Sequence, residues 1–96
     1  MKRRRDFSVG VLVESFLREQ GLEARLAEHR VVSAWKSVVG ERAARATTQL
    51  FVRNETLHAT ISSAAVRNEL FMRRSEIITR LNQVAGRQAI RDLYLH

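Results

Sequence analysis

The spacing of the apolar residues changes twice along this chain, and this change limits the folds that it can adopt. Residues 9–39 repeat their apolar positions every three or four residues, as a helix with one buried face does. Residues 48–62 alternate apolar and polar side chains, as strands do when one side of their sheet is buried. The helical period returns over residues 63–85. Helices before and after a pair of strands indicate an α+β domain.

Two helices are expected before the strands. The first covers residues 8–20 and begins at Ser8, whose hydroxyl suits the first position of a helix. The second covers residues 22–39, and a short helical segment follows at residues 41–46. The apolar pattern weakens over residues 29–33, where either a kink or a break is compatible with the sequence. The expected core residues of the second helix are Leu22, Leu26, Trp35, Val38 and Val39.

Two strands are expected over residues 48–53 and 56–62, joined by the polar turn Asn54-Glu55. They form a hairpin with one buried face. Phe51 points away from the buried face of its strand, so the second face of the sheet is either partly covered or used as an interface. The buried face of the second strand carries Leu57, Ala59 and Ile61.

A single long helix is expected over residues 63–85, and Arg73 conflicts with it. Arg73 falls only about 20° outside the apolar arc of a straight helix, and burying an unpaired guanidinium costs several kcal/mol. Three alternative arrangements would resolve the conflict: the Arg73 side chain could extend to the edge of the core, it could pair with Glu69, or the helix could break near residues 71–74. The apolar arc consists of Val66, Leu70, Ile77, Leu81 and Val84.

The chain closes with a strand that is expected over residues 89–95, with a bulge. The helix between the second and third strands would cross over one face of a three-stranded sheet. One helix leaves much of that face uncovered, so the earlier helices must cover it as well. The sequence therefore predicts one two-layer α+β domain over residues 8–96, preceded by a flexible basic tail at residues 1–7.

The positive charge of the chain is concentrated at its start. The net charge is +7, of which Lys2, Arg3, Arg4 and Arg5 contribute four, so the remaining residues carry only +3. A basic tail favours an acidic partner, such as nucleic acid, an anionic membrane or an acidic protein surface. The alternative is a disordered end that only improves solubility.

Basic residues also gather in the expected long helix. Arg67 and Arg74 lie on one side of the apolar arc, and Arg73 and Arg80 lie on the other. One interpretation is a solvated face held by ion pairs, and the other is a contact with nucleic acid or protein. The ion pairs expected for a solvated face are Glu69–Arg73 and Glu76–Arg80.

Two aromatic residues of the helices have different expected roles. Trp35 lies among apolar residues, so we expect a core anchor rather than a stacking platform for bases. Phe71 lies outside the apolar arc of its helix. It is therefore either an exposed contact residue or is covered by the first helix.

The sequence contains no recognisable catalytic motif. His29, His58 and His96 are scattered, with no cysteine or paired carboxylate nearby, which argues against a metal site. The chain has no triad spacing, phosphate loop or dinucleotide motif, so we expect neither an enzyme nor a cofactor. It has no apolar run long enough for a membrane span. The apolar stretch at residues 9–13 is too short for a signal peptide, so we expect none. The lack of cysteine fits a reducing cytoplasm.

A series of short motifs runs from the second helix to the last strand. In their order and distances, these motifs resemble the DciA-like family of bacterial replicative-helicase operators. The resemblance extends over roughly residues 10–95, and residues 65–95 are most similar to short members from Bacteroidetes-type bacteria. The motifs are Ala-Trp-Lys-Ser-Val-Val-Gly-Glu at residues 34–41, residues 57–62, Arg-Asn-Glu-Leu at residues 67–70, Ile-Ile-Thr-Arg-Leu-Asn at residues 77–82, Gly86 and residues 90–95.

This resemblance implies a K-homology-like fold of the type II order, α-β-β-α-α-β, which requires the helix to break near residues 71–74. K-homology domains that bind nucleic acid carry a Gly-x-x-Gly loop at that junction. This chain has Phe-Met-Arg-Arg there instead. Arginine side chains would then have to replace backbone amides as partners of phosphate groups.

The resemblance also implies a function. It indicates a cytoplasmic, nucleoid-associated adaptor without enzymatic activity, which binds the replicative DNA helicase and assists its placement on single-stranded DNA. One alternative is an RNA- or single-stranded-DNA-binding protein without a helicase partner, and another is a protein-interaction module that uses Phe51 and Phe71. The candidate residues for nucleic-acid or partner binding are Lys2, Arg3, Arg4, Arg5, Arg67, Phe71, Arg73, Arg74 and Arg80.

Overall fold

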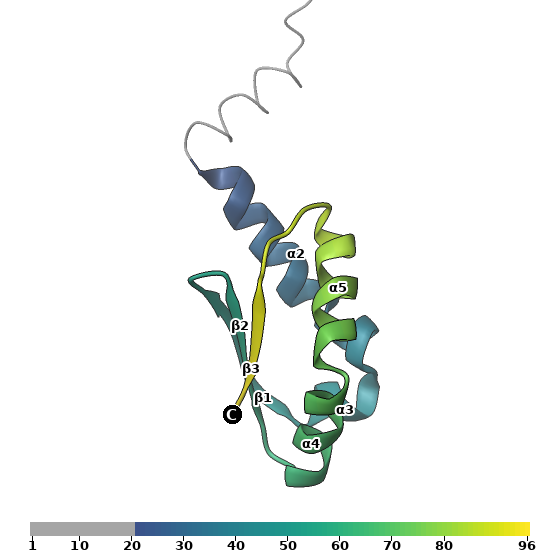
Figure 1. Ribbon diagram of the computed structural model, residues 1–96. Helices are drawn as coiled ribbons and strands as arrows, with labels where there is room; N and C mark the ends of the chain where they lie inside the picture. Colours follow the sequence, from purple (N-terminus) through teal and green to yellow (C-terminus); the bar gives the residue numbers. More distant parts are fainter. Residues whose placement is uncertain (1–20) are drawn as a thin grey trace, which may run out of the picture.

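The computed structural model describes residues 21–96, which form four helices and three strands. The helix predicted over residues 8–20 and the basic residues 2–5 lie outside the described residues. The α+β class predicted from the sequence is confirmed (Figure 1). In chain order, the elements are α2 (Leu22–Val39), α3 (Glu41–Arg45), β1 (Thr47–Arg53), β2 (Thr56–Ile61), α4 (Ala64–Met72), α5 (Arg74–Ala85) and β3 (Asp92–Leu95).

The three strands form one sheet in the order β1-β2-β3. β1 and β2 make the predicted antiparallel hairpin. Asn54 and Glu55 at its turn have φ values of 51° and 60°, and such left-handed values let a two-residue turn follow the twist of the strands. β3 pairs with β2 in parallel, because the connection through α4 and α5 carries the chain back to the end at which β2 begins.

The helices pack on one face of the sheet (Figure 1). Alternate residues of β2 are buried there, and they share one core with apolar residues of α2, α4 and α5. Trp35 is only 3% exposed, which confirms its predicted place in the core. Its Nε1–H donates to the Thr47 hydroxyl oxygen at 3.0 Å, so the buried indole nitrogen has a partner. Among the described residues, every buried side chain is apolar.

The long helix predicted over residues 63–85 is broken in two. α4 ends at Met72 and α5 begins at Arg74, with Arg73 between them at φ −104° and ψ 13°. Of the three arrangements that would resolve the conflict at Arg73, the structure therefore contains the break. α2, in contrast, continues without interruption through residues 29–33.

Two residues predicted for the core are exposed instead. Val84 is 54% exposed, because the buried stripe of α5 ends at Ala85 and adjacent residues of a helix point about 100° apart. Leu26 is 42% exposed, because its neighbour Ala27 takes the inward position on α2. In both cases a neighbouring alanine replaces the larger side chain against the core.

The last strand begins at Asp92, so the strand predicted over residues 89–95 is too long. The side chain of Asn82 replaces a strand partner for the preceding residues. Its Oδ1 accepts from the N–H groups of Ala89 and Ile90 at 2.9 and 3.0 Å, and its Nδ2 donates to the Ile90 carbonyl at 2.9 Å. The pairing of β3 with β2 is regular, so the predicted bulge is also wrong.

We expect Asn82→Ala to lower the free energy of unfolding by about 2–4 kcal/mol. The substitution removes the side-chain partner of the N–H group and the carbonyl of Ile90, whereas the N–H of Ala89 keeps its bond to the Arg87 carbonyl. Each group left unpaired costs about 1 kcal/mol or more. Urea denaturation followed by circular dichroism measures the change. Asn68→Ala is the matched control, because Asn68 is exposed on α4, and it should change stability by less than about 0.5 kcal/mol. Equal losses in the two variants would contradict the role of Asn82.

Candidate functional site

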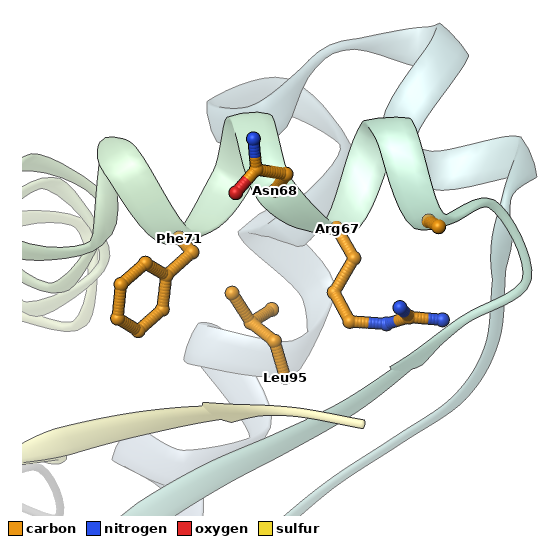
Figure 2. A pocket seen from close by; sticks show the side chains of 5 residues that line it. Arg67, Asn68, Phe71 and Leu95 are labelled. Carbon is orange, nitrogen blue, oxygen red and sulfur yellow. The ribbon is translucent and has the colours of Figure 1, made fainter.

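The first candidate site is the helix junction, which we define as residues 67–74 together with Arg80. Its arginines contact backbone carbonyl groups. In α4, the Arg67 Nε donates to the His96 carbonyl at 2.9 Å, and its Nη2 donates to the Ile61 carbonyl at 3.0 Å. Arg67 therefore joins the end of β2 to the residue that follows β3, and its side chain runs past Leu95 toward the strands (Figure 2).

Arg74 connects the start of α5 to β3. Its Nε donates to the Leu93 carbonyl at 2.9 Å, and its guanidinium forms an ion pair with Asp92. The Arg74 side chain is 36% exposed, so part of it remains in contact with solvent. This arginine holds the helix junction against the strand that completes the sheet.

Arg73 and Arg80 converge on the end of α2. Both guanidinium groups lie near the Val38 carbonyl, at 3.4 and 3.5 Å. Positive charge is favourable there, because the last carbonyls of a helix carry partial negative charge. Both also pair loosely with Glu76, at 3.7 and 3.9 Å. The predicted Glu76–Arg80 pair is therefore present.

The predicted Glu69–Arg73 ion pair is wrong. Glu69 pairs instead with Arg42 of α3 at 2.9 Å. The break after Met72 turns Arg73 away from the preceding helical turn and toward α2. The arginines of the helix junction thus connect five elements, α2, α4, α5, β2 and β3, rather than forming a row on one helix face.

The outer surface of the helix junction is apolar. Within residues 21–96, Phe71 is 62% exposed and Met72 is 74% exposed; the first helix, which was the alternative cover for Phe71, lies outside the described residues. Phe71, Arg67 and Leu95 line a shallow hollow of about 310 Å³ (Figure 2). A Gly-x-x-Gly loop would offer backbone amides at this place, whereas this chain offers an aromatic ring and a thioether.

The second candidate site is the open face of the sheet, opposite the helices (Figure 1). An aromatic row crosses it, which we define as Phe51, His58, Tyr94 and His96. Phe51 and His58 are cross-strand partners, as are His58 and Tyr94. The ring centroids are 4.8 Å apart in the first pair and 5.7 Å in the second, with planes inclined by 6° and 25°.

His96 completes the aromatic row beyond the end of β3. Its ring stacks on Tyr94 at 4.3 Å with planes inclined by 6°. Its Nε2 also lies 3.1 Å from the His58 Nδ1, a contact that requires one donor and one acceptor nitrogen. The rings therefore hold one another in place across three strands.

The sequence alone did not single out the aromatic row. The alternation in the hairpin already placed Phe51 and His58 on its outward side. Tyr94 and His96 could be added only when the pairing of β3 with β2 was known, because the predicted strand started too early. The structure does not bring the aromatic row together with the exposed Phe71, which lies on α4.

Two further observations concern the part of the chain that the structure describes. None of its helices combines the length and apolar character needed to cross a membrane. Within residues 21–96, no group of three or more His, Cys, Asp or Glu side chains lies close enough to hold a metal ion.

We expect Arg74→Gln to lower the free energy of unfolding by about 1 kcal/mol, because it removes one hydrogen bond and one partly exposed ion pair. Thermal and urea unfolding of the full chain measure this loss. Arg87→Gln is the control of equal charge, since Arg87 forms no ion pair within residues 21–96. If Arg74→Gln and Arg87→Gln had the same free energy of unfolding, the contacts of Arg74 with β3 would not stabilise the helix junction.

Comparison with known proteins shows similarity over most of the chain. A family model described as "Dna[CI] antecedent, DciA" matches residues 8–95. A protein of Mycolicibacterium smegmatis, named "UPF0232 protein in recF-gyrB intergenic region", is 28% identical over 78 residues, which cover 81% of this chain and 40% of that protein. A UPF0232 protein of Mycolicibacterium smegmatis (strain ATCC 700084 / mc(2)155) matches with the same identity and coverage. The chain thus spans about 40% of the length of these curated relatives.

Proposed function

This chain belongs to the DciA family, and on that premise we propose that it is an adaptor that binds the replicative DNA helicase. In this proposal it assists the placement of the helicase on single-stranded DNA and contacts the DNA weakly itself. The family is associated with helicase loading in DNA replication. The observation that carries the proposal is the family match over residues 8–95.

The adaptor acts by binding and catalyses no reaction. Its sequence contains no Gly-x-x-x-x-Gly-Lys loop with which to bind the phosphates of ATP. Energy for helicase placement must therefore come from binding or from another protein. The proposed place of action is the cytoplasm, at the nucleoid.

We propose a K-homology-like arrangement for the folded part. The order of α3, β1, β2, α4, α5 and β3 supports it, since it matches α-β-β-α-α-β. The Phe-Met-Arg-Arg sequence at the helix junction argues against the usual clamp on a nucleic-acid backbone. This leaves the outer surface of the helix junction available for a protein partner.

The exposed side chains of Phe71 and Met72 are the proposed contact with the helicase. Large exposed apolar side chains next to charged ones are typical of protein interfaces, where a few such residues carry most of the affinity. Arg42 and Glu69 form an ion pair on the neighbouring surface and supply a polar edge. Arg67, Arg73, Arg74 and Arg80 hold this surface in place.

Isothermal titration calorimetry with the helicase of the same organism tests the proposal. We expect binding at low-micromolar protein concentrations, and we expect Phe71→Ser combined with Met72→Ser to weaken it about 30-fold, the effect of losing about 2 kcal/mol. Val84→Ser is the control, because Val84 is an exposed apolar residue on α5. The absence of binding by the unaltered chain would refute the adaptor role.

The basic residues 2–5 are proposed as an additional contact with DNA. Deleting residues 1–5 removes four positive charges, so the slope of log affinity against log salt should fall by up to about 3, at roughly 0.7 per phosphate on a single strand. The melting temperature should stay nearly unchanged. An unaltered DNA affinity would show that these residues only improve solubility.

A second candidate function is a single-strand-binding protein without a helicase partner. The aromatic row on the open sheet face favours it, because protein surfaces that bind single strands often present aromatic rings to the bases. A chain that bound single-stranded nucleic acid but gave no heat with the helicase would fit this function instead.

A further inference from the structure

The aromatic row offers ring surface to a ligand even though its rings stack on one another. Directly stacked rings lie roughly 3.5 Å apart, whereas the centroids of Phe51 and His58 are 4.8 Å apart with nearly parallel planes. These two rings are therefore offset and overlap only in part. Phe51 at one end of the row is 37% exposed, and Tyr94 between His58 and His96 is 57% exposed, so both rings keep surface that solvent can reach.

The surroundings of the aromatic row are polar, which distinguishes it from the core of a protein interface. Gln49, Arg53 and Thr60 line a hollow of about 350 Å³ together with Phe51, His58 and His96. Amide and hydroxyl groups beside rings can pair with the edges of bases. The fully buried centre of a protein–protein interface, in contrast, is mostly apolar.

The charge of the open sheet face suits a phosphate backbone. Arg53 at the end of β1 forms no ion pair within residues 21–96, so its guanidinium is available there. Asp92 on β3 is paired with Arg74, which offsets its negative charge. The face therefore combines exposed rings, polar groups and one uncompensated cation beside a hollow.

We propose that the aromatic row and Arg53 form a site on which the bases of single-stranded DNA stack. Phe51 and Tyr94 supply the stacking surfaces, because every base has a flat face and aromatic stacking tolerates any sequence. Arg53 contacts a phosphate. This inference rests on the DNA contact in the proposed function, but it assigns that contact to the sheet face rather than to the helix junction.

Fluorescence anisotropy with a labelled oligo(dT) of about 20 nucleotides tests the site, since this length exceeds the 4–16 nucleotides that stacking sites commonly cover. Tyr94→Leu keeps an apolar side chain but removes the ring, and we expect it to weaken binding by roughly 5- to 150-fold. Val84→Ser is the control, because Val84 is 54% exposed and Tyr94 is 57% exposed. Val84→Ser should change the affinity for oligo(dT) by less than about twofold.

The salt dependence separates stacking from charge. Arg53→Gln should reduce the slope of log affinity against log salt by about 0.7, and Tyr94→Leu should leave that slope unchanged. Because Arg53 lies in the same face, this second variant tests the site even if Tyr94→Leu unfolds. Unaltered affinity and slope in both variants would overturn the inference, as would tenfold tighter binding of oligo(U) than of oligo(dT).

Calorimetry with the helicase distinguishes this inference from the proposed function. Loss of oligo(dT) affinity in Tyr94→Leu, with helicase binding retained, would support the stacking site. If Tyr94→Leu instead lost helicase binding and kept its affinity for oligo(dT), the sheet face would be a protein interface. That result would overturn the proposed stacking site. If the unaltered chain bound the helicase but no oligo(dT), the stacking site would fail while the adaptor role would stand.

Discussion

The parallel pairing of β3 with β2 is the constraint on which the rest of this structure depends. A strand that runs parallel to its neighbour must begin at the same end of the sheet, so the chain has to return over one face. α4 and α5 contain 9 and 12 residues, and an unbroken helix of that combined length would extend about 32 Å. β2 has six residues and spans only about 20 Å. The break at Arg73 lets the two helices fit the sheet that they cover.

The arginines around the break follow from the same constraint. A junction between two helices exposes backbone carbonyls from the elements that meet there. Arg67 and Arg74 satisfy carbonyls at the ends of β2 and β3, and Arg73 and Arg80 lie near the last turn of α2. A basic cluster that resembles a binding patch in the sequence is thus largely part of the framework. Within residues 21–96, the surfaces that we propose for partners are the apolar outer side of the helix junction and the aromatic row.

Much of the fold could be predicted from the sequence because the relevant interactions are local. The alternation in residues 56–62 is a property of neighbouring residues, and it correctly identified the buried face of β2. The conflict at Arg73 was also visible, since it requires only the angle between residues of one helix. The start of β3 could not be predicted in this way. It depends on Asn82, which binds the backbone of Ile90 eight residues later only after the intervening loop has folded back onto α5.

The sequence by itself determined the α+β class, the hairpin, the buried place of Trp35 and the family. These follow from short-range periodicity, turn residues and the order of motifs along the chain. Only the tertiary structure decided where the arginines donate their hydrogen bonds and which rings stand side by side on the open face of the sheet. The physical reason is that His58 acquires its neighbours from β1, β3 and the residue beyond β3. Such contacts join positions far apart in the chain, and no local pattern records them.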